Sequence, residues 1–224
     1  MVINEIFYSL QGEGLLAGVP SIFIRLAGCP IGCKWCDTKY ALDPSSGDDL
    51  SIGQIINRVS LTSDESRVTS HECRHIVITG GEPMVNAELP ELAASLKKQG
   101  KHITIETAGI KFVPGIACDL MSISPKTSKN SGQETKNKAV KQLISHYPYQ
   151  LKFVVDSPDD LPEIRRVVKS LVKVDPTRIM LMPQARTRKT LLAKSPMVAE
   201  LCAKTGYAFC GRLQILLYDG ARGK

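Results

Sequence analysis

Three cysteines stand close together in the segment GCPIGCKWCDT, residues 28–38. They are Cys29, Cys33 and Cys36, with the spacing C-x3-C-x2-C. Thiolates are soft ligands that bind iron–sulfur clusters, zinc or copper(I). Three thiolates on one loop can each hold one corner of a four-iron cubane, which leaves the fourth iron with an open coordination site. Electron carriers use four cysteines instead, so this spacing predicts a cluster that binds a second molecule.

Two other interpretations of these cysteines stay open on the residues alone. A disulfide would leave one of the three over, and the chain has 7 cysteines, an odd number. A structural zinc site needs a fourth ligand, and the next candidates, His71 and Cys73, are far along the chain. The spacing therefore favours the open-site cluster, with zinc as the main alternative.

Length and composition predict one globular domain over residues 1–224, with a short polar tail at its C-terminal end. Hydrophobic residues make up 43% of the chain, which is enough for one core. No stretch approaches the roughly 20 apolar residues of a membrane span. The first residues lack the basic region of a signal peptide. Free thiols in this number are typical of a reducing compartment, so we expect a cytoplasmic protein with no membrane partner.

The excess of basic residues does not indicate nucleic-acid binding. The formal charge is +7, and the densest basic run, residues 126–141, contains five lysines. That run has no aromatic residue on which a base could stack. We therefore interpret it as a solvated segment and expect no direct nucleic-acid binding.

Alternating strand and helix patterns predict a parallel sheet with crossover helices. The predicted strands are residues 3–8, 21–26, 75–79, 102–106, 118–124, 151–155, 178–182 and 212–217. The predicted helices are residues 52–59, 88–98, 135–147, 159–172 and 195–205. A full eightfold barrel takes about 250 residues. We therefore expect an open, partial TIM-like barrel of about six parallel strands.

Polar residues stand at the ends of several predicted strands, where barrels place their active sites. These residues are Thr79, Glu106, Ser124 and Gln184. An arginine, Arg25, interrupts the apolar strand before the cysteines. It needs an acidic partner, either a protein carboxylate or a substrate carboxylate.

Together these motifs resemble a known family. C-x3-C-x2-C is the signature of the radical S-adenosylmethionine (SAM) enzymes. The wider set is similar to the 7-carboxy-7-deazaguanine synthases within that superfamily, and it covers the first two-thirds of the chain well. The matching motifs are SLQGEG at 9–14, FIRL at 23–26, GCPIGCKWCDT, ITGGEP at 78–83, ETAG at 106–109 and SPK at 124–126.

The resemblance implies a carbon–nitrogen lyase of queuosine and 7-deazapurine biosynthesis, a pathway of tRNA modification. It would convert 6-carboxy-5,6,7,8-tetrahydropterin to 7-carboxy-7-deazaguanine with loss of ammonia. SAM would chelate the open iron, and its reductive cleavage would yield a 5′-deoxyadenosyl radical that abstracts hydrogen from the substrate. The implied cofactors are a [4Fe-4S] cluster, SAM and Mg²⁺. The implied partners are the pterin, an electron donor such as flavodoxin, and a second copy of the chain.

The resemblance also assigns roles to single residues. Cys29, Cys33 and Cys36 match the cluster ligands. Thr38 matches a magnesium ligand and, with Arg25, is assigned to catalysis. The SAM contacts would be Trp35, Cys36, Asp37, Gly81, Glu82, Ser124, Pro125 and Lys126, and also Met182, Pro183, Gln184 and Ala185. The substrate contacts would be Leu10, Gln11, Gly12, Arg25, Thr79 and Gln214.

Three other functions remain open at this point. A glycyl-radical-enzyme activase shares the cysteine spacing but needs a surface for a partner protein. A zinc-stabilised binding module would carry no iron. A tRNA-modifying radical enzyme would suit the positive charge, although no added RNA-binding domain is visible.

Overall fold

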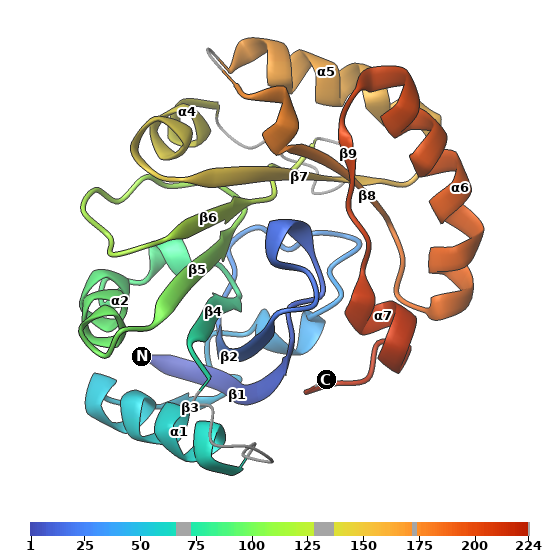
Figure 1. Cartoon of the computed structure of the whole chain (residues 1–224). Coiled ribbons are helices and arrows are strands. Elements are labelled where there is room, and N and C mark those ends of the chain that lie inside the picture. The colour runs from blue at the N-terminus through green and yellow to red at the C-terminus, as the bar shows by residue number, and fades with distance from the viewer. Residues whose placement is uncertain (66–72, 128–136, 172–173, 224) are drawn as a thin grey trace.

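The computed structural model describes residues 1–65, 73–127, 137–171 and 174–223. Its described strands form one curved sheet around a central space, in the order β3-β1-β2-β4-β5-β6-β7-β8-β9 (Figure 1). The strands are β1 (Val2–Leu10), β2 (Pro20–Leu26), β3 (Asp48–Asp49), β4 (His75–Gly80), β5 (His102–Thr107), β6 (Leu120–Ile123), β7 (Tyr149–Val155), β8 (Ile179–Pro183) and β9 (Ala208–Phe209).

The strands from β2 to β9 pair in parallel, whereas β1 is antiparallel to both β2 and β3. The sheet does not close, because β3 and β1 form one edge and β9 forms the other. The prediction of an open, partial barrel is therefore confirmed. The six predicted central strands are β2 and β4–β8, and β9 adds a short seventh parallel strand.

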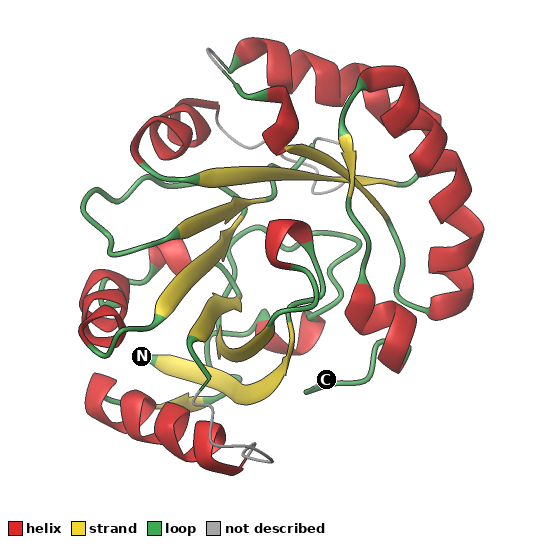
Figure 2. Ribbon diagram, in the orientation of Figure 1, coloured by secondary structure: helices red, strands yellow, loops and turns green. Residues whose placement is uncertain are grey.

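Helices cover the outside of the sheet (Figure 2). They are α1 (Ile52–Glu65), α2 (Leu89–Lys98), α4 (Asn137–His146), α5 (Leu161–Ser170) and α6 (Arg188–Thr205), whereas α7 (Leu213–Tyr218) lies on the inner side of α6 (Figure 1). In α2 the buried residues are Leu89, Leu92, Ala93 and Leu96, the spacing of one helix face. No helix in these described ranges combines the length and the hydropathy needed to cross a bilayer.

Side chains alternate between the two faces of each strand, which separates the core from the site. In β2, Ile22, Ile24 and Leu26 belong to the main core cluster, so Phe23 and Arg25 point to the other face. The same alternation places Ile103 and Ile105 of β5 in the core and directs Thr104 and Glu106 inward. In β7, Leu151, Phe153 and Val155 lie in the core, so Lys152 faces inward. The inner face is thus a polar surface within an apolar shell.

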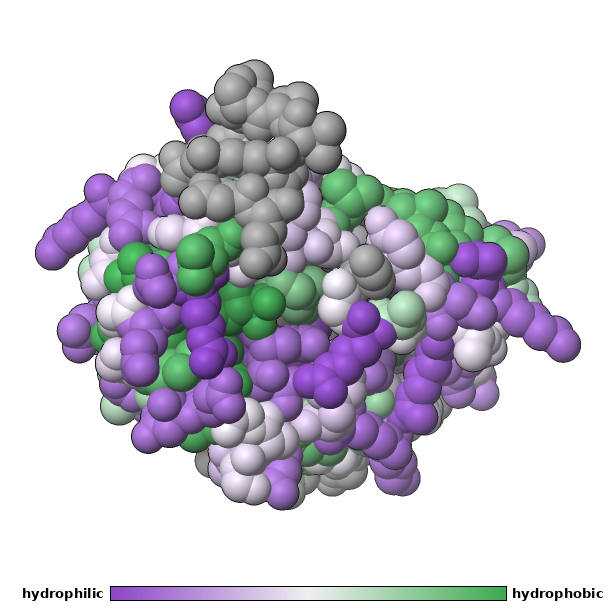
Figure 3. Space-filling view, turned by 90° about the horizontal axis from the view of Figure 1, so that it is seen from below, coloured by the Kyte–Doolittle hydropathy of each residue, from purple (hydrophilic) through white to green (hydrophobic). Residues whose placement is uncertain are grey.

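The hydropathy of the outer surface is as expected if the apolar side chains lie between the sheet and the helices. On the face shown in Figure 3, hydrophilic side chains cover most of the surface and hydrophobic ones form separate areas. Most large apolar side chains are buried between the sheet and the helices. Exposed exceptions include Leu192, Leu216 and Leu217.

One predicted element is wrong. Residues 212–217 were expected to be a final strand, but Leu213–Tyr218 is the helix α7. A short apolar run fits a strand and a buried helix equally well, and periodicity alone does not separate them. Only Ile215 of this helix is fully buried, since α7 rests on the edge of the site and not in the sheet.

The predicted start of the last helix is also wrong. The last helix was expected from Ser195, but α6 begins at Arg188, where the Thr187 side chain accepts from the backbone N–H of Thr190. Pro196 lies inside this helix. The predicted helices 135–147 and 159–172 correspond to α4 and α5, and residues 135, 136 and 172 lie outside the described ranges.

Candidate active site

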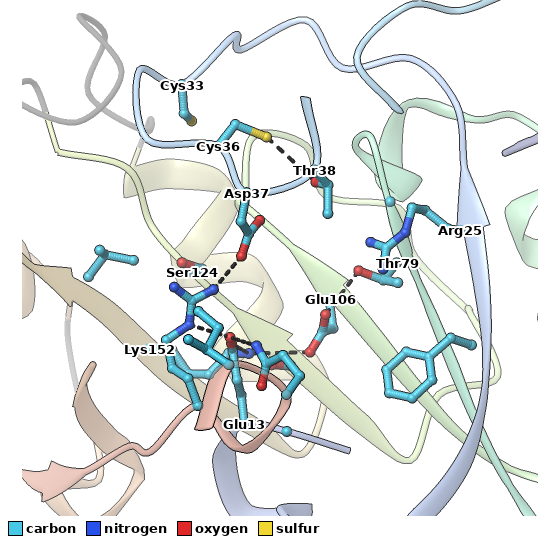
Figure 4. A pocket seen from close by; sticks show the side chains of 18 of the residues that line it. Glu13, Arg25, Cys33, Cys36, Asp37, Thr38, Thr79, Glu106, Ser124 and Lys152 are labelled. Atoms are coloured by element: carbon cyan, nitrogen blue, oxygen red, sulfur yellow. Dashed lines mark hydrogen bonds and ion pairs between the residues drawn. The ribbon is translucent and has the colours of Figure 1, made fainter. Parts of the chain in front are cut away.

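A cavity of about 460 Å³ opens on the inner face, at the carboxyl ends of the parallel strands (Figure 4). Most residues expected at the site from the sequence line it. They are Leu10, Gln11, Gly12, Arg25, Cys29, Cys33, Trp35, Cys36, Asp37, Thr38, Thr79, Gly81, Glu82, Ser124, Lys126, Met182, Gln184 and Gln214. Pro125, Pro183 and Ala185 are neighbours of lining residues in the chain but do not line the cavity themselves.

The cysteine loop follows β2 directly and lies over the cavity. Backbone hydrogen bonds hold its two ends together, with Gly28 N–H donating to Ala41 at 2.9 Å and Cys29 N–H to Leu42 at 3.2 Å. The three cysteines of the loop are free, partly exposed thiols. Burial raises the pKa of the Cys33 thiol, and the neighbouring Cys29 and Cys36 raise it further, whereas Lys126 opposes them. The three sulfurs are therefore close enough to influence one another electrostatically.

The donor set of this loop suits an iron–sulfur cluster. The other cysteines, Cys73, Cys118, Cys202 and Cys210, do not line the cavity. The three thiols are soft ligands on one loop, although no three His, Cys, Asp or Glu side chains of the described residues are grouped to hold a single metal ion. Thr38 follows them, and its Oγ1 lies 3.5 Å from Cys36 Sγ.

The turn after β4 packs directly against this loop. Gly81 N–H donates to the Leu26 carbonyl at 2.8 Å, and Glu82 N–H donates to the Gly28 carbonyl at 3.0 Å. A Cβ on Gly81 would lie 1.7 Å from the Gly28 carbonyl oxygen, a distance that no side chain can adopt. Gly81, the second glycine of the GGEP motif, is therefore required for the close approach of this turn to the backbone at Gly28.

Gly81→Ala is expected to displace the cysteine loop and to lower its capacity for a cluster several-fold. Iron and labile sulfide per chain after reconstitution would measure the loss. Gly53→Ala is the matched control, because a Cβ on Gly53 in α1 meets nothing within 4 Å. Full cluster content in the Gly81→Ala protein would contradict the role given to this contact.

Glu82 is buried and ties the end of β4 to the end of β5. Its carboxylate accepts hydrogen bonds from Thr107 Oγ1 at 2.6 Å, from Ala108 N–H at 2.8 Å and from Met84 N–H at 3.1 Å. Burial raises the pKa of Glu82, although these hydrogen bonds oppose the increase. Glu82 lines the cavity, but its oxygens are already bound within the protein, so its predicted contact with SAM stays a prediction.

A network of charged side chains forms one wall of the cavity (Figure 4). Lys152 on β7 is only 4% exposed, and its Nζ lies 2.9 Å from Glu13 Oε2 and 3.2 Å from Glu106 Oε1. Glu106 also accepts from Thr79 Oγ1 at 2.9 Å and from Gln11 Nε2 at 3.3 Å. The two carboxylates are therefore fixed in position by one buried ammonium.

The same network extends to α7. Arg212 Nε donates to Glu13 Oε1 at 3.0 Å, and Arg212 also pairs with Asp37, the residue after the last loop cysteine. Gln214 Nε2 donates to Glu13 at 2.8 Å. Burial would raise the pKa of Glu13, but Lys152 and Arg212 hold it far below its usual range. Glu13 is thus a permanently ionised group between the sheet and the cysteine loop.

Arg25 marks the opposite side of the cavity, on β2. Its Nε donates to Glu5 Oε1 at 2.6 Å, and the Tyr40 hydroxyl donates to the same oxygen at 3.0 Å. The protein carboxylate expected as one of two possible partners is therefore Glu5. Arg25 nevertheless lines the cavity, which leaves its guanidinium accessible to a ligand.

Sequence reasoning did not assign a role to Lys152, Arg212, Glu13 or Glu5. A signal existed for Lys152, because a lysine within an apolar strand needs a partner for the same reason as Arg25. Arg212 was placed on a strand that does not exist. No local pattern indicates Glu5, since its partners come from distant parts of the chain.

Comparisons with known proteins place these features in a family. The model of the radical SAM superfamily matches residues 23–127. A 7-carboxy-7-deazaguanine synthase of Rhodopirellula baltica is 37% identical over 238 residues, covering 100% of this chain and 88% of the relative. The enzyme of that name from Halobacterium salinarum is 35% identical, covering 98% and 91%. That of Escherichia coli is 31% identical, covering 95% and 94%.

Solved structures agree with the sequence matches. The crystal structure of QueE from Escherichia coli superposes with a TM-score of 0.71 at 28% identity, covering 93% of this chain and 92% of that one. Streptococcus suis SuiB bound to its precursor peptide superposes with a TM-score of 0.60 at 13% identity, covering 84% and 47%. The second likeness concerns the fold alone.

Proposed function

Because the chain belongs to the 7-carboxy-7-deazaguanine synthase family of the radical SAM superfamily, we propose that it converts 6-carboxy-5,6,7,8-tetrahydropterin to 7-carboxy-7-deazaguanine with loss of ammonia. It is a radical SAM lyase of 7-deazapurine biosynthesis. The observation that carries the proposal is one cavity lined by both the thiols of the cysteine loop and the inward-facing charges of the sheet.

Cys29, Cys33 and Cys36 hold the [4Fe-4S] cluster in this proposal. When bound, the cluster and SAM supply a carbon-centred radical that abstracts a hydrogen atom from the substrate. The chain positions SAM beside the loop through side chains that face the cavity. These are Trp35, Asp37, Ser124, Lys126, Met182 and Gln184. Lys126 also donates to Ser124 Oγ at 2.9 Å, which fixes both groups near the thiols.

The charged wall suits the pyrimidine edge of a pterin. That edge carries N–H donors, and ionised carboxylates accept strong hydrogen bonds from such donors. Glu106 and Glu13 both pair with the Lys152 ammonium and face the same cavity. Gln11 and Thr79 orient Glu106. These four residues form the proposed recognition site for the ring.

In this proposal the carboxylate of the substrate binds on the side of the cavity formed by Arg25. Arg25 and Glu106 stand on β2 and β5, which are separated in the sheet only by β4. At about 4.8 Å per strand, their backbones are ~10 Å apart, enough to bind the two ends of one pterin acid. Thr38 and the substrate carboxylate together form the proposed Mg²⁺ site, since Mg²⁺ takes few protein ligands and is often completed by the substrate.

The proposal also includes the electron donor, the oligomeric state and the cellular location of the enzyme. The electron donor is a small redox protein such as flavodoxin, and the active form is a homodimer. We place the enzyme in the cytoplasm, where its free thiols remain reduced. The described sheet runs from Val2 to Phe209, which supports a single domain over the chain.

The test is anaerobic incubation of the reconstituted protein with the carboxylated pterin, SAM and a chemical reductant. The expected products are 7-carboxy-7-deazaguanine, which is lighter than the pterin by one ammonia, and 5′-deoxyadenosine. Mass analysis of the reaction detects both. Cleavage of SAM with no change in the pterin would overturn the proposed substrate and leave the membership of the superfamily intact.

A further inference from the structure

A short strap after α7 lines part of the cavity. We define the strap as residues 219–223, and four of them, Gly220, Ala221, Arg222 and Gly223, line the cavity. The chain reverses at its start, because Asp219 has φ +53° and Gly220 has φ +75°. Asp219 Oδ1 accepts from Arg188 N–H at 2.5 Å, which fixes the strap to the start of α6.

Gly220 is packed closely at this turn. A Cβ on Gly220 would lie 2.8 Å from the Arg186 carbonyl oxygen, closer than real side chains come. The left-handed φ adds a second reason for glycine. The path of the strap over the cavity therefore depends on Gly220.

Arg222, in the strap, contacts the same carboxylate as Arg25. Its Nε donates to Glu5 Oε2 at 3.0 Å, and its Nη2 donates to Asn4 Oδ1 at 3.0 Å. Arg25 holds the other oxygen of the same carboxylate, Glu5 Oε1. Both guanidinium groups also approach the Tyr40 ring, with Cζ at 4.3 Å from the centroid for Arg222 and 5.9 Å for Arg25.

The charges at this end of the cavity do not cancel. Two guanidinium groups face one carboxylate, so the trio of Arg25, Arg222 and Glu5 carries a net charge of +1. Burial would raise the pKa of Glu5, but hydrogen bonds from both arginines lower it, and Glu5 stays ionised at neutral pH. Burial raises the pKa of Tyr40 to about 12, so its hydroxyl remains neutral. One positive charge is left for a ligand.

We propose that Arg222 is a specificity-determining residue that binds the substrate carboxylate together with Arg25, with the strap as the closing wall of that subsite. The inference rests on the proposed function, because it assigns a second cation to the carboxylate of the same pterin. A guanidinium offers several N–H donors in a planar fork, and Glu5 and Asn4 use only two of those of Arg222. The Arg222 side chain is 56% exposed and becomes covered when a carboxylate binds beneath it.

The experiment compares two ligands on the reconstituted holoenzyme with SAM present. One is 6-carboxy-5,6,7,8-tetrahydropterin and the other is tetrahydropterin without the carboxylate. Arg222→Gln is expected to raise the Kd for the carboxylated ligand about tenfold, the size of one charge-assisted hydrogen bond, and to leave the Kd for the other unchanged. Arg58→Gln is the matched control, since Arg58 pairs with Asp48 on the surface at 2.9 Å.

A second pair of variants tests the strap without changing charge. Gly220→Ala is expected to produce the same selective loss. Gly206→Ala is its control, because Gly206 has φ +75° at the end of α6 and a Cβ there meets nothing within 4 Å. Both replacements introduce similar backbone strain, but only the first displaces the strap.

The outcomes are distinct. If the wild-type enzyme neither binds nor converts the carboxylated pterin, the proposed function fails irrespective of Arg222. If the wild type converts it and Arg222→Gln leaves its Kd unchanged, the role of Arg222 is overturned. An equal loss for both pterins would also overturn it, because the effect would then not depend on the carboxylate.

Discussion

Cys33→Ala is expected to abolish both cluster binding and turnover. The variant keeps only two thiolates on the loop, and the four other cysteines lie off the cavity. Turnover should fall to the background rate, a loss of roughly 10⁶-fold or more, which is the lower range of enzymatic rate enhancement. The measurements are iron and sulfide per chain, visible absorption under anaerobic conditions, and formation of 5′-deoxyadenosine.

Cys118→Ala is the matched control for this experiment. Burial raises the pKa of the Cys118 thiol to about 12, so the group stays protonated at neutral pH. Its Sγ donates to the Ile103 carbonyl oxygen of β5 at 3.7 Å, from the loop that precedes β6. This variant should keep its colour and its activity. A Cys33→Ala protein that retained both would contradict the ligand assignment.

Lys152→Met is expected to destabilise the fold by about 3–5 kcal/mol and to remove activity with the pterin. The replacement leaves Glu13 and Glu106 in a buried wall without the ammonium that both contact. Arg212 still pairs with Glu13, whereas Glu106 loses the ammonium that it contacts, and breaking a buried ion pair costs far more than breaking an exposed one. Urea unfolding followed by circular dichroism would measure the free energy of unfolding.

The pH dependence of this loss has a definite sign. Burial lowers the Lys152 pKa, but Glu106 and Glu13 raise it overall. The stabilisation by Lys152 is therefore present below about pH 10.4 and is lost only as the pH rises through the pKa of Lys152 in the folded protein. The Glu13 pKa is lowered, so the stabilisation by Glu13 is present above about pH 4.3 and is lost as the pH falls toward its pKa in the folded protein. The wild-type pair is therefore intact throughout the neutral range.

In Lys152→Met, Glu13 loses one of its two cationic partners, and burial then raises the Glu13 pKa from its wild-type position. Ionisation of Glu13 destabilises the variant, so the difference in unfolding free energy from the wild type should be larger at pH 8 than at pH 5. Lys97→Met is the control, because Lys97 pairs with Asp119 at the surface and is 43% exposed. A difference that did not change with pH would contradict the assigned charge state of Glu13.

Much of the fold followed from local patterns. Each central strand is a short apolar run between turn residues, and the helices between them carry one apolar face, as α2 does. The arrangement of parallel strands then follows from the order of the elements. The segment Leu213–Tyr218 was different, because its apolar residues do not alternate and its contacts with the edge of the site decide its form.

Some residues of the site can likewise be predicted from the sequence, and others cannot. The cysteine loop, Thr79 and Glu106 are visible in the sequence, because their roles follow from spacing or from position at the end of a strand. Lys152 and Glu13 are 139 residues apart, and Arg212 and Glu13 are 199 residues apart. Such pairings depend on the assembly of the whole sheet, and no local pattern specifies them.

The unclosed sheet has a consequence for the size of the ligand. Among the described strands no backbone ladder joins β1 to β9, and this gap is bridged by contacts such as Leu213 N–H to the Gly12 carbonyl at 2.9 Å. On this side the chamber is bounded by the short helix α7, whose cap Arg212 contacts Glu13 and Asp37. Substitutions in α7 can therefore change the volume of the chamber without altering the pairing of any strand.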